Sequence, residues 1–200
     1  MNRKTCENVL SIIMITVLLC SCFGQTPPAA FYTLGTIQEE TPQDKLPAEF
    51  YLAVGPVSIP SELDRPQIVI RDHEGRIKLS EFHRWAGSFP DNIASVLSTN
   101  LSVLLGTDRI VPRHHGDLYP LTHFIVLHIN RFDGQLQGEV LLDVTWSIQK
   151  TRHLEPLIVK RSVIHEPVLS GDYTGLVAAQ SKALAGLGRE ISPAVMEMVE

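Results

Sequence analysis

Several side chains of the chain could act in catalysis, but their spacing argues against the usual arrangements. Ser147 and Lys150 form a Ser-x-x-Lys sequence, in which a lysine could activate a serine nucleophile. The segment has strand periodicity, and residues three apart on a strand point to opposite faces, so these two cannot cooperate. Gly186 and Gly188 lie in a helical pattern and lack the third glycine of a dinucleotide-binding loop. We therefore predict no catalytic residue and no enzymatic activity.

The eight histidines raise the question of a metal site. His114 and His115 are adjacent in a predicted loop and cannot easily bind one ion together. His123 and His128 are five residues apart on a predicted strand, so they face opposite sides of it. No His-Glu-x-x-His sequence occurs. The sequence predicts neither a metal site nor a cofactor, and the histidines are expected at the surface or hydrogen-bonded in the core.

One cysteine near the N-terminus has the setting of a lipid-attachment site. Arg3 and Lys4 precede an apolar segment at residues 9–19, which suits a signal peptide but is too short to span a bilayer. Leu19-Cys20-Ser21-Cys22 follows, with the hydrophobic, small, cysteine order of a bacterial lipobox. Residues 1–21 are predicted to be a lipoprotein signal peptide.

Cys22 then becomes the lipidated first residue of the mature protein. The alternative is a signal that is retained or ordinarily cleaved, with incidental cysteines. Residue 23 is Phe, whereas an Asp at this position resembles the inner-membrane retention signal. The sequence therefore favours a protein anchored in the outer membrane and facing the periplasm.

The predicted mature chain is acidic and has no cysteine after its first residue. Removal of the first 21 of the 200 residues leaves 179, enough for one domain with a sizeable core. The removed segment holds two of the 17 basic and one of the 22 acidic residues, so 15 basic and 21 acidic residues remain. The net charge of about -6 argues against nucleic acid or anionic lipid headgroups as electrostatic partners. Neither a disulfide nor a thiolate metal site is expected in the folded part.

The remaining chain alternates strand and helix patterns. Residues 22–30 read as a tether, and residues 31–200 as the domain that it carries. Strands are expected at residues 31–34, 50–57, 67–71, 77–79, 109–111, 121–132, 139–150 and 156–165. The strand at 50–57 should stop at Gly55-Pro56, and the strand at 121–132 is apolar on both faces, as in the centre of a sheet.

Two helices complete the pattern. One is capped by Ser88 and ends at Gly106, and the other follows Asp172 and ends or kinks at Pro193. The last three strands should form an antiparallel meander. The predicted class is α/β (α+β), with a mixed, largely antiparallel sheet and two main helices packed on it.

Several stretches together resemble the PqiC/YmbA family of auxiliary lipoproteins of ABC-type, MCE-associated transport systems. They are, in chain order, Phe31-Tyr32-Thr33-Leu34, Val54-Gly55-Pro56-Val57, Pro60, Leu63, Asp64-Arg65-Pro66-Gln67-Ile68-Val69, Glu81-Phe82-His83-Arg84-Trp85, Asp91-Asn92-Ile93, Leu104-Leu105-Gly106-Thr107-Asp108, Asp172-Tyr173, Val177-Ala178-Ala179-Gln180-Ser181 and Leu184. The resemblance covers essentially the whole predicted mature chain. It implies a non-enzymatic outer-membrane lipoprotein that supports envelope integrity by taking part in lipid transport between membranes.

The resemblance also implies partners. These are an MCE-domain protein that spans the periplasm and an inner-membrane component, and a homo-oligomeric ring would suit a symmetric tube. Candidate partner contacts are Leu63, Asp64, Arg65, Gln67, Arg84 and Trp85. For the last two, the bland alternative is a stacked pair that pins the hairpin to the helix.

Two other hypotheses differ in class. The first is a periplasmic lipoprotein that binds lipid or a small ligand by itself, which predicts a large enclosed apolar pocket. The second is an envelope hydrolase, which needs a converging serine, histidine and carboxylate that the sequence does not offer.

Overall fold

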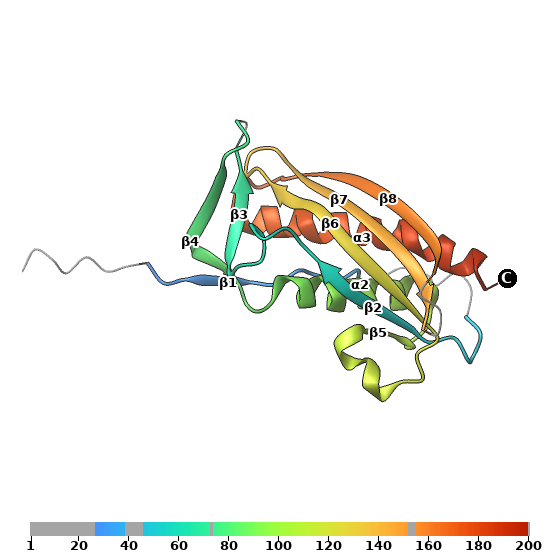
Figure 1. Cartoon of the computed structure of the whole chain (residues 1–200). Helices are drawn as coiled ribbons and strands as arrows, with labels where there is room; N and C mark the ends of the chain where they lie inside the picture. Colours follow the sequence, from blue (N-terminus) through green and yellow to red (C-terminus); the bar gives the residue numbers. More distant parts are fainter. Residues whose placement is uncertain (1–26, 39–45, 73, 152–154, 200) are drawn as a thin grey trace, which may run out of the picture.

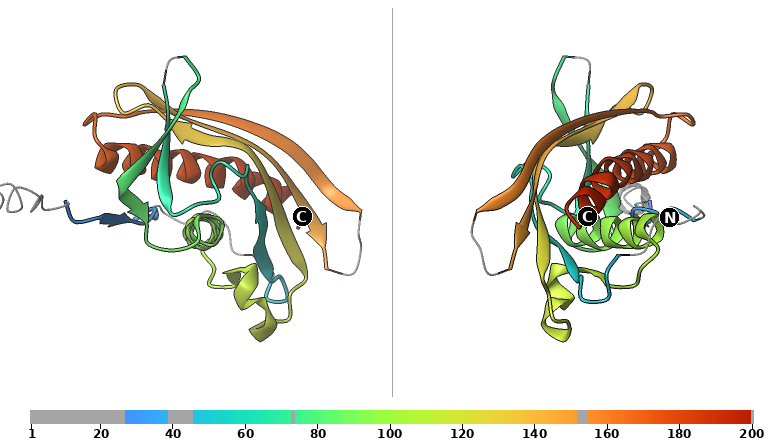
Figure 2. Two further views of the ribbon diagram at one scale, coloured as in Figure 1. Left: turned by 60° about the vertical axis from the view of Figure 1, so that its left-hand side comes forward. Right: turned by 90° about the vertical axis from the view of Figure 1, so that its right-hand side faces the viewer.

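The structure is a computed structural model that describes residues 27–38, 46–72, 74–151 and 155–199. Cys22 and the predicted signal peptide lie outside these residues. Figure 1 shows one long, curved sheet with the two helices along one side. The helices are α2 (Phe89–Leu105) and α3 (Tyr173–Glu197), and the right-hand view of Figure 2 shows the sheet curving around α3. The predicted fold class is confirmed.

Eight strands form the sheet. They are β1 (Ala30–Tyr32), β2 (Leu52–Ser58), β3 (Gln67–Arg71), β4 (Ile77–Trp85), β5 (Ile110–Pro112), β6 (His123–Gly134), β7 (Glu139–Lys150) and β8 (Pro156–Pro167). One path through the sheet runs β1-β4-β3-β6-β2-β5, and β7 and β8 extend it from the other edge of β6. β6 is thus central, as predicted, with β2 and β3 on one edge and β7 on the other. The pairs β3–β4, β6–β7 and β7–β8 are antiparallel, and the other pairs are parallel.

The predicted meander of β6, β7 and β8 is confirmed, and it contributes much of the core. The apolar residues of β7 that share one face are each at most 1% exposed: Val140, Leu142, Val144, Trp146 and Ile148. Burial of such side chains contributes roughly 1.5–3 kcal/mol each before entropy is counted. On β8, the face that points away from the helices is open to solvent. Leu157, Val159 and Val163 lie on it and are 45%, 59% and 51% exposed.

Helix α2 begins and ends where its sequence predicts. The Ser88 hydroxyl accepts a hydrogen bond from the Asp91 N–H at 3.4 Å, and Gly106 closes the helix with φ of 64°. Helix α3 begins after Asp172, whose carboxylate accepts from the Gly175 N–H at 2.7 Å. It does not end at Pro193 but continues to Glu197. Burial of the following residues, Ala194 and Val195, offsets the hydrogen bond that the proline cannot make.

Three strand predictions need correction. β2 does not stop at Gly55-Pro56, because a register shift between Val54 and Val57 lets it continue to Ser58. β4 continues to Trp85 instead of ending at residue 79, again with a register shift opposite β3. β6 is not apolar on both faces, since His128 and Asn130 are exposed beside buried Leu127 and Ile129.

A fourth correction concerns the end of β6, which was predicted at residue 132. Asp133 and Gly134 are still paired with β7, and residues 135–138 make the turn. A Cβ on Gly134 would lie 2.7 Å from the Glu139 carbonyl oxygen, so this close approach requires glycine.

Candidate docking surface beside the tether

The side chains considered for catalysis and metal binding lie on β7 and around the turn η2 (Arg113–Leu118). Ser147 receives a hydrogen bond from the Gln149 side chain at 3.1 Å, both being half-buried on the outer face of β7, whereas Lys150 is exposed at the end of the strand. His114 contacts the ring of His115 at 4.4 Å and lies 4.0 Å from an Asp91 oxygen. Within the described parts of the chain, no three His, Cys, Asp or Glu side chains gather as a metal site.

The segment that follows the tether is fastened to the domain. β1 pairs in parallel with β4, so that Phe31 lies opposite Arg84 and Tyr32 opposite Trp85. The Tyr32 hydroxyl is 2.8 Å from His83 Nδ1, and the His83 ring stacks on Tyr173 of α3 at 4.0 Å. The aromatic stack therefore connects β1 to α3 through β4.

Side chains from both helices hold the next residues, which we call the strap (residues 33–37). The Leu34 and Ile37 N–H groups donate to the side-chain oxygens of Asn92 and Asn100 on α2, at 2.8 and 2.9 Å. The Gly35 N–H donates to the Ser181 hydroxyl on α3 at 2.9 Å. Because these bonds use backbone donors that no strand partner satisfies, the strap keeps an extended path across the helices.

The six predicted partner contacts divide into buried and accessible side chains. Leu63 and Trp85 are only 3% and 6% exposed. Trp85 stacks on Phe89 of α2 with ring centroids 4.3 Å apart, so its side chain is core. The remaining four, Asp64, Arg65, Gln67 and Arg84, are exposed or half-buried.

The predicted Arg84–Trp85 stack is not formed. Arg84 Nε instead donates to the Glu81 carbonyl oxygen at 3.1 Å, while the Trp85 ring faces the helix. The two residues follow each other on a strand and therefore point to opposite faces. The pinning role predicted for the pair falls to Trp85 alone.

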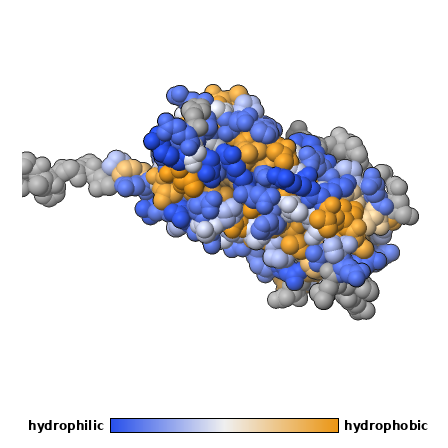
Figure 3. Space-filling model, turned by 45° about the horizontal axis from the view of Figure 1, so that its top comes forward, coloured by the Kyte–Doolittle hydropathy of each residue, from blue (hydrophilic) through white to orange (hydrophobic). Residues whose placement is uncertain are grey.

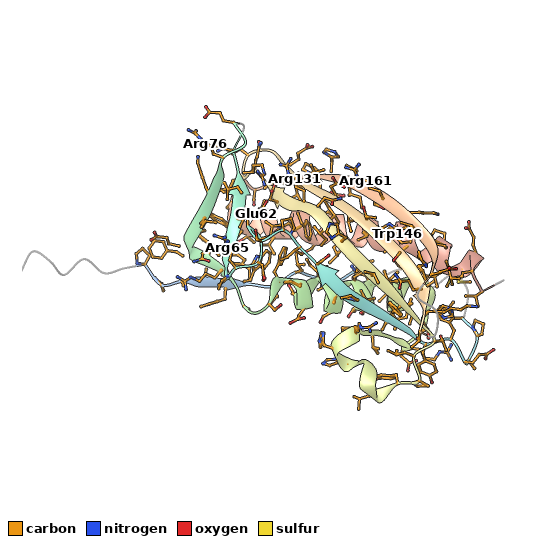
Figure 4. All side chains as sticks on the ribbon, in the orientation of Figure 1. Glu62, Arg65, Arg76, Arg131, Trp146 and Arg161 are labelled. Atoms are coloured by element: carbon orange, nitrogen blue, oxygen red, sulfur yellow. The ribbon has the colours of Figure 1, made fainter. Side chains whose placement is uncertain are left out.

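Strand pairing brings some of the accessible residues together. Gln67 lies opposite Arg84 on β3 and β4, and Phe31 lies opposite Arg84 on β1 and β4. Directly paired residues share a face of the sheet, so Phe31, Arg84 and Gln67 form one cross-strand row. Arg65 Nε is buried without a hydrogen-bond partner, and Figure 4 places Arg65 at the end of the molecule that carries β1. We call Asp64, Arg65, Gln67 and Arg84 the tether-side surface.

A buried ionic cluster fixes β3 to the meander, and sequence reasoning missed it. Asp133 is 1% exposed, and its carboxylate accepts hydrogen bonds from Arg71 Nε at 2.9 Å and from Arg131 Nε at 2.8 Å. Glu62 adds a weaker contact to Arg71 at 3.9 Å. The hydrogen bond from Arg71 to Asp133 raises the pKa of the Arg71 guanidinium, despite its partial burial. The sequence signal was a charged aspartate directly after the apolar strand predicted at residues 121–132.

Comparison with known proteins identifies the family. Residues 32–192 match the family model described as "ABC-type transport auxiliary lipoprotein component". The chain belongs to this family. The resemblance drawn from the sequence is thereby confirmed, and the match spans the strap, strands β2 to β8, helix α2 and most of helix α3.

Solved structures support the fold of this auxiliary lipoprotein. A crystal structure of an uncharacterized protein matches with a TM-score of 0.69 at 16% identity, covering 84% of this chain and 99% of that one. The protein XCC0632 from Xanthomonas campestris matches with a TM-score of 0.61 at 15% identity, covering 81% and 92%. No curated protein matches. Neither helix in the described residues is long and apolar enough to cross a membrane.

Proposed function

We propose that this auxiliary lipoprotein is anchored in the outer membrane through Cys22 and works without catalysis in lipid transport between the membranes. Its partners are an MCE-domain protein that spans the periplasm and an inner-membrane transport component. The observation that carries the proposal is the family match over residues 32–192. It coincides with the lipobox and with a domain that begins only a few residues after it.

The attachment of β1 and the strap supports an adaptor role. Cys22 and Ala30, the first residue of β1, are separated by eight residue steps, which span at most about 25–30 Å when extended. Because β1 and the strap are fastened to the sheet and to both helices, the domain cannot extend this distance without losing those bonds. A domain held this close to a membrane suits docking better than free sampling of the periplasm.

We place the protein partner at Asp64 and Arg65 of the tether-side surface. Arg65 forms no ion pair with any residue that the structure describes, so its charge is available to a carboxylate of a partner. Copies of the chain arranged as a ring would present this surface repeatedly to a symmetric tube.

No observation favours a lipid-binding protein that works alone. A hollow of about 640 Å³ at the end of α2 is open to solvent and partly lined by Thr99, Thr107, Asp108 and Arg109. A second, of about 510 Å³, lies between the strap and α3 and is also open, with Lys182 and Glu166 in its lining. Neither is the enclosed apolar pocket that storage of an acyl chain requires.

The anchor is tested by Cys22→Ser in cells fed a labelled fatty acid. We expect the label to be lost while the domain stays folded, because the described core is formed by residues between Leu34 and Val195. Retention of the label in the variant would overturn the assignment of the anchor.

The partner is tested by co-purification of the lipidated protein with an MCE-domain protein from the same cells. Arg65→Ala should strongly reduce recovery of the partner. Arg161→Ala on β8 is the matched control, since it also removes one exposed arginine but lies outside the tether-side surface. Absence of any MCE partner, with the lipoprotein folded and abundant, would overturn the adaptor role.

A further inference from the structure

Phe31 is an exposed aromatic side chain at the point where the tether enters the domain. It is 65% exposed, whereas its neighbour Tyr32 turns inward to His83. Single exposed apolar side chains are common on protein surfaces, so what Phe31 can contact is decided by its position beside the tether. Figure 3 shows hydrophobic surface beside the place where the tether leaves the body.

The tether restricts what can cover Phe31. Cys22 and Phe31 are nine residues apart, so the ring lies within about 30 Å of the lipidated residue. Figure 1 shows residues 27–29 leading away from β1 at the end opposite to the C-terminus. A tethered group meets its target at a high effective concentration, so a contact that is weak in isolation is still populated. The nearest surface guaranteed to be present is the leaflet that holds the anchor.

The charges around Phe31 fit a zwitterionic lipid headgroup. Arg84 is directly opposite Phe31 and forms no ion pair with any described residue, in contrast to Arg71, Arg131 and Arg161. An aromatic ring at headgroup depth with a guanidinium near the phosphates is a common interfacial arrangement. The predicted mature chain is acidic overall, so no general attraction to anionic membranes is expected.

We propose that Phe31 inserts into the headgroup region of the leaflet that holds the Cys22 lipid, with Arg84 at the level of the phosphates. The inference rests on the proposed anchor and adds a second point of attachment to it. Two points fix the orientation of the domain, whereas a single tether would let it swing. Phe31 and Arg84 then face the lipid, and Asp64 and Arg65, in the segment before β3, are left to a protein partner.

The test introduces a fluorescent reporter at the contact. Lipidated full-length protein carrying Phe31→Trp is reconstituted into phosphatidylcholine and phosphatidylethanolamine vesicles whose acyl chains carry bromine, a quencher of tryptophan. The native Trp85 and Trp146 are 6% and 1% exposed and provide a constant background. Leu118→Trp is the matched control, because Leu118 is 82% exposed on the helical turn η2 (Arg113–Leu118), which Figure 1 shows far from β1.

We expect the emission added by Phe31→Trp to be quenched and that added by Leu118→Trp to be unchanged. Combination of Phe31→Trp with Arg84→Glu should reduce the quenching. Flotation of the protein with vesicles but no quenching at residue 31 would overturn this contact and leave the anchor intact. An emission change at residue 31 that occurs only when an MCE-domain protein is added would mean that the face binds protein, which also overturns it. Failure to float would overturn the anchor and the contact together.

Discussion

The meander of this lipoprotein pairs more continuously than its tether-side strands, which are β1, β3 and β4. β6, β7 and β8 have 12 residues each and pair over nearly their whole length. β1, β3 and β4 have three, five and nine residues. The register shift between β3 and β4 skips residues 80–83 of β4, whereas the shifts in the meander skip only Asn130 and Leu157. β3 meets β6 only at Ile70 and Gly134.

The meander contributes most to the stability of the domain, and the tether-side strands present the groups that can bind a partner or the membrane. The inner face of the meander is covered by the helices, and its apolar residues are almost all fully buried. The tether-side strands have exposed aromatic and charged groups instead, and much of their fixation comes from specific polar contacts: the strap bonds, the Tyr32–His83 pair and the Asp133 cluster. We expect substitutions in the first region to change the free energy of unfolding and substitutions in the second to change what the domain binds.

The largest effect is expected in the centre of the meander. Trp146→Ala should reduce the free energy of unfolding by about 3–5 kcal/mol, because it leaves a cavity and removes the donor that Nε1 provides to the Ser162 hydroxyl at 2.9 Å. Urea denaturation measures the change. Trp146→Phe, which keeps most of the ring, should cost clearly less, and Val159→Ala on the exposed face should change little. Similar losses for all three variants would contradict the division into inner and outer faces.

The next largest effect is expected where the two regions meet. Asp133→Asn leaves Arg71 and Arg131 near each other without their shared carboxylate. Their side chains are 22% and 36% exposed, so we expect a loss of about 2–3 kcal/mol, less than for a fully buried pair.

Asp143→Asn is the matched control for the Asp133 cluster. Its partner Arg161 is 62% exposed, and such pairs contribute at most about 1 kcal/mol. Hydrogen exchange should show β3 and β4 opening more readily in Asp133→Asn than in the wild type. Equal protection in the two proteins would mean that the tether-side strands do not depend on the cluster.

The sequence predicted the meander and helices better than the tether side, for a physical reason. Burial of every second residue gives an alternating sequence pattern, which predicted the inward residues of β7. Capping residues predicted the ends of α2. A register shift leaves no such pattern, and neither the continuation of β2 past Gly55 nor that of β4 to Trp85 was predicted. Contacts between distant segments, such as Arg71 with Asp133, also have no local signal. The partition of the candidate contacts into buried Trp85 and accessible Arg84 became visible only with the pairing.

A smaller effect concerns the turn between β3 and β4. The side-chain hydrogen bond from Arg76, at 2.9 Å, is the main cause that lowers the pKa of Asp72 to about 2, and the Arg76 and Glu74 N–H groups add to it. Because this pKa is below the ordinary 3.8, the ionised form stabilises the fold. The contribution is complete above about pH 4 and is lost as the pH falls through 2.

Titration of the Asp72 carboxyl carbon by NMR measures this pKa directly. In Arg76→Gln it should rise toward 3.8, because the main hydrogen-bond donor is removed. Arg84→Gln, at the far end of β4, is the control and should leave the pKa of Asp72 unchanged. A pKa near 3.8 in the wild type would show that the turn does not hold its polar contacts in solution.

The smallest effect on stability is expected at Phe31, and it makes the sharpest contrast with the core. Phe31→Ala should change the free energy of unfolding in solution by no more than about 0.5 kcal/mol, because the ring is already 65% exposed. Phe89→Ala is the matched control, since it truncates the same type of side chain where it is 3% exposed and stacked on Trp85, and it should cost about 3–5 kcal/mol. A comparable loss from both would assign Phe31 to the core. An exposed ring that the fold does not need for its stability is free to make the membrane contact that we propose.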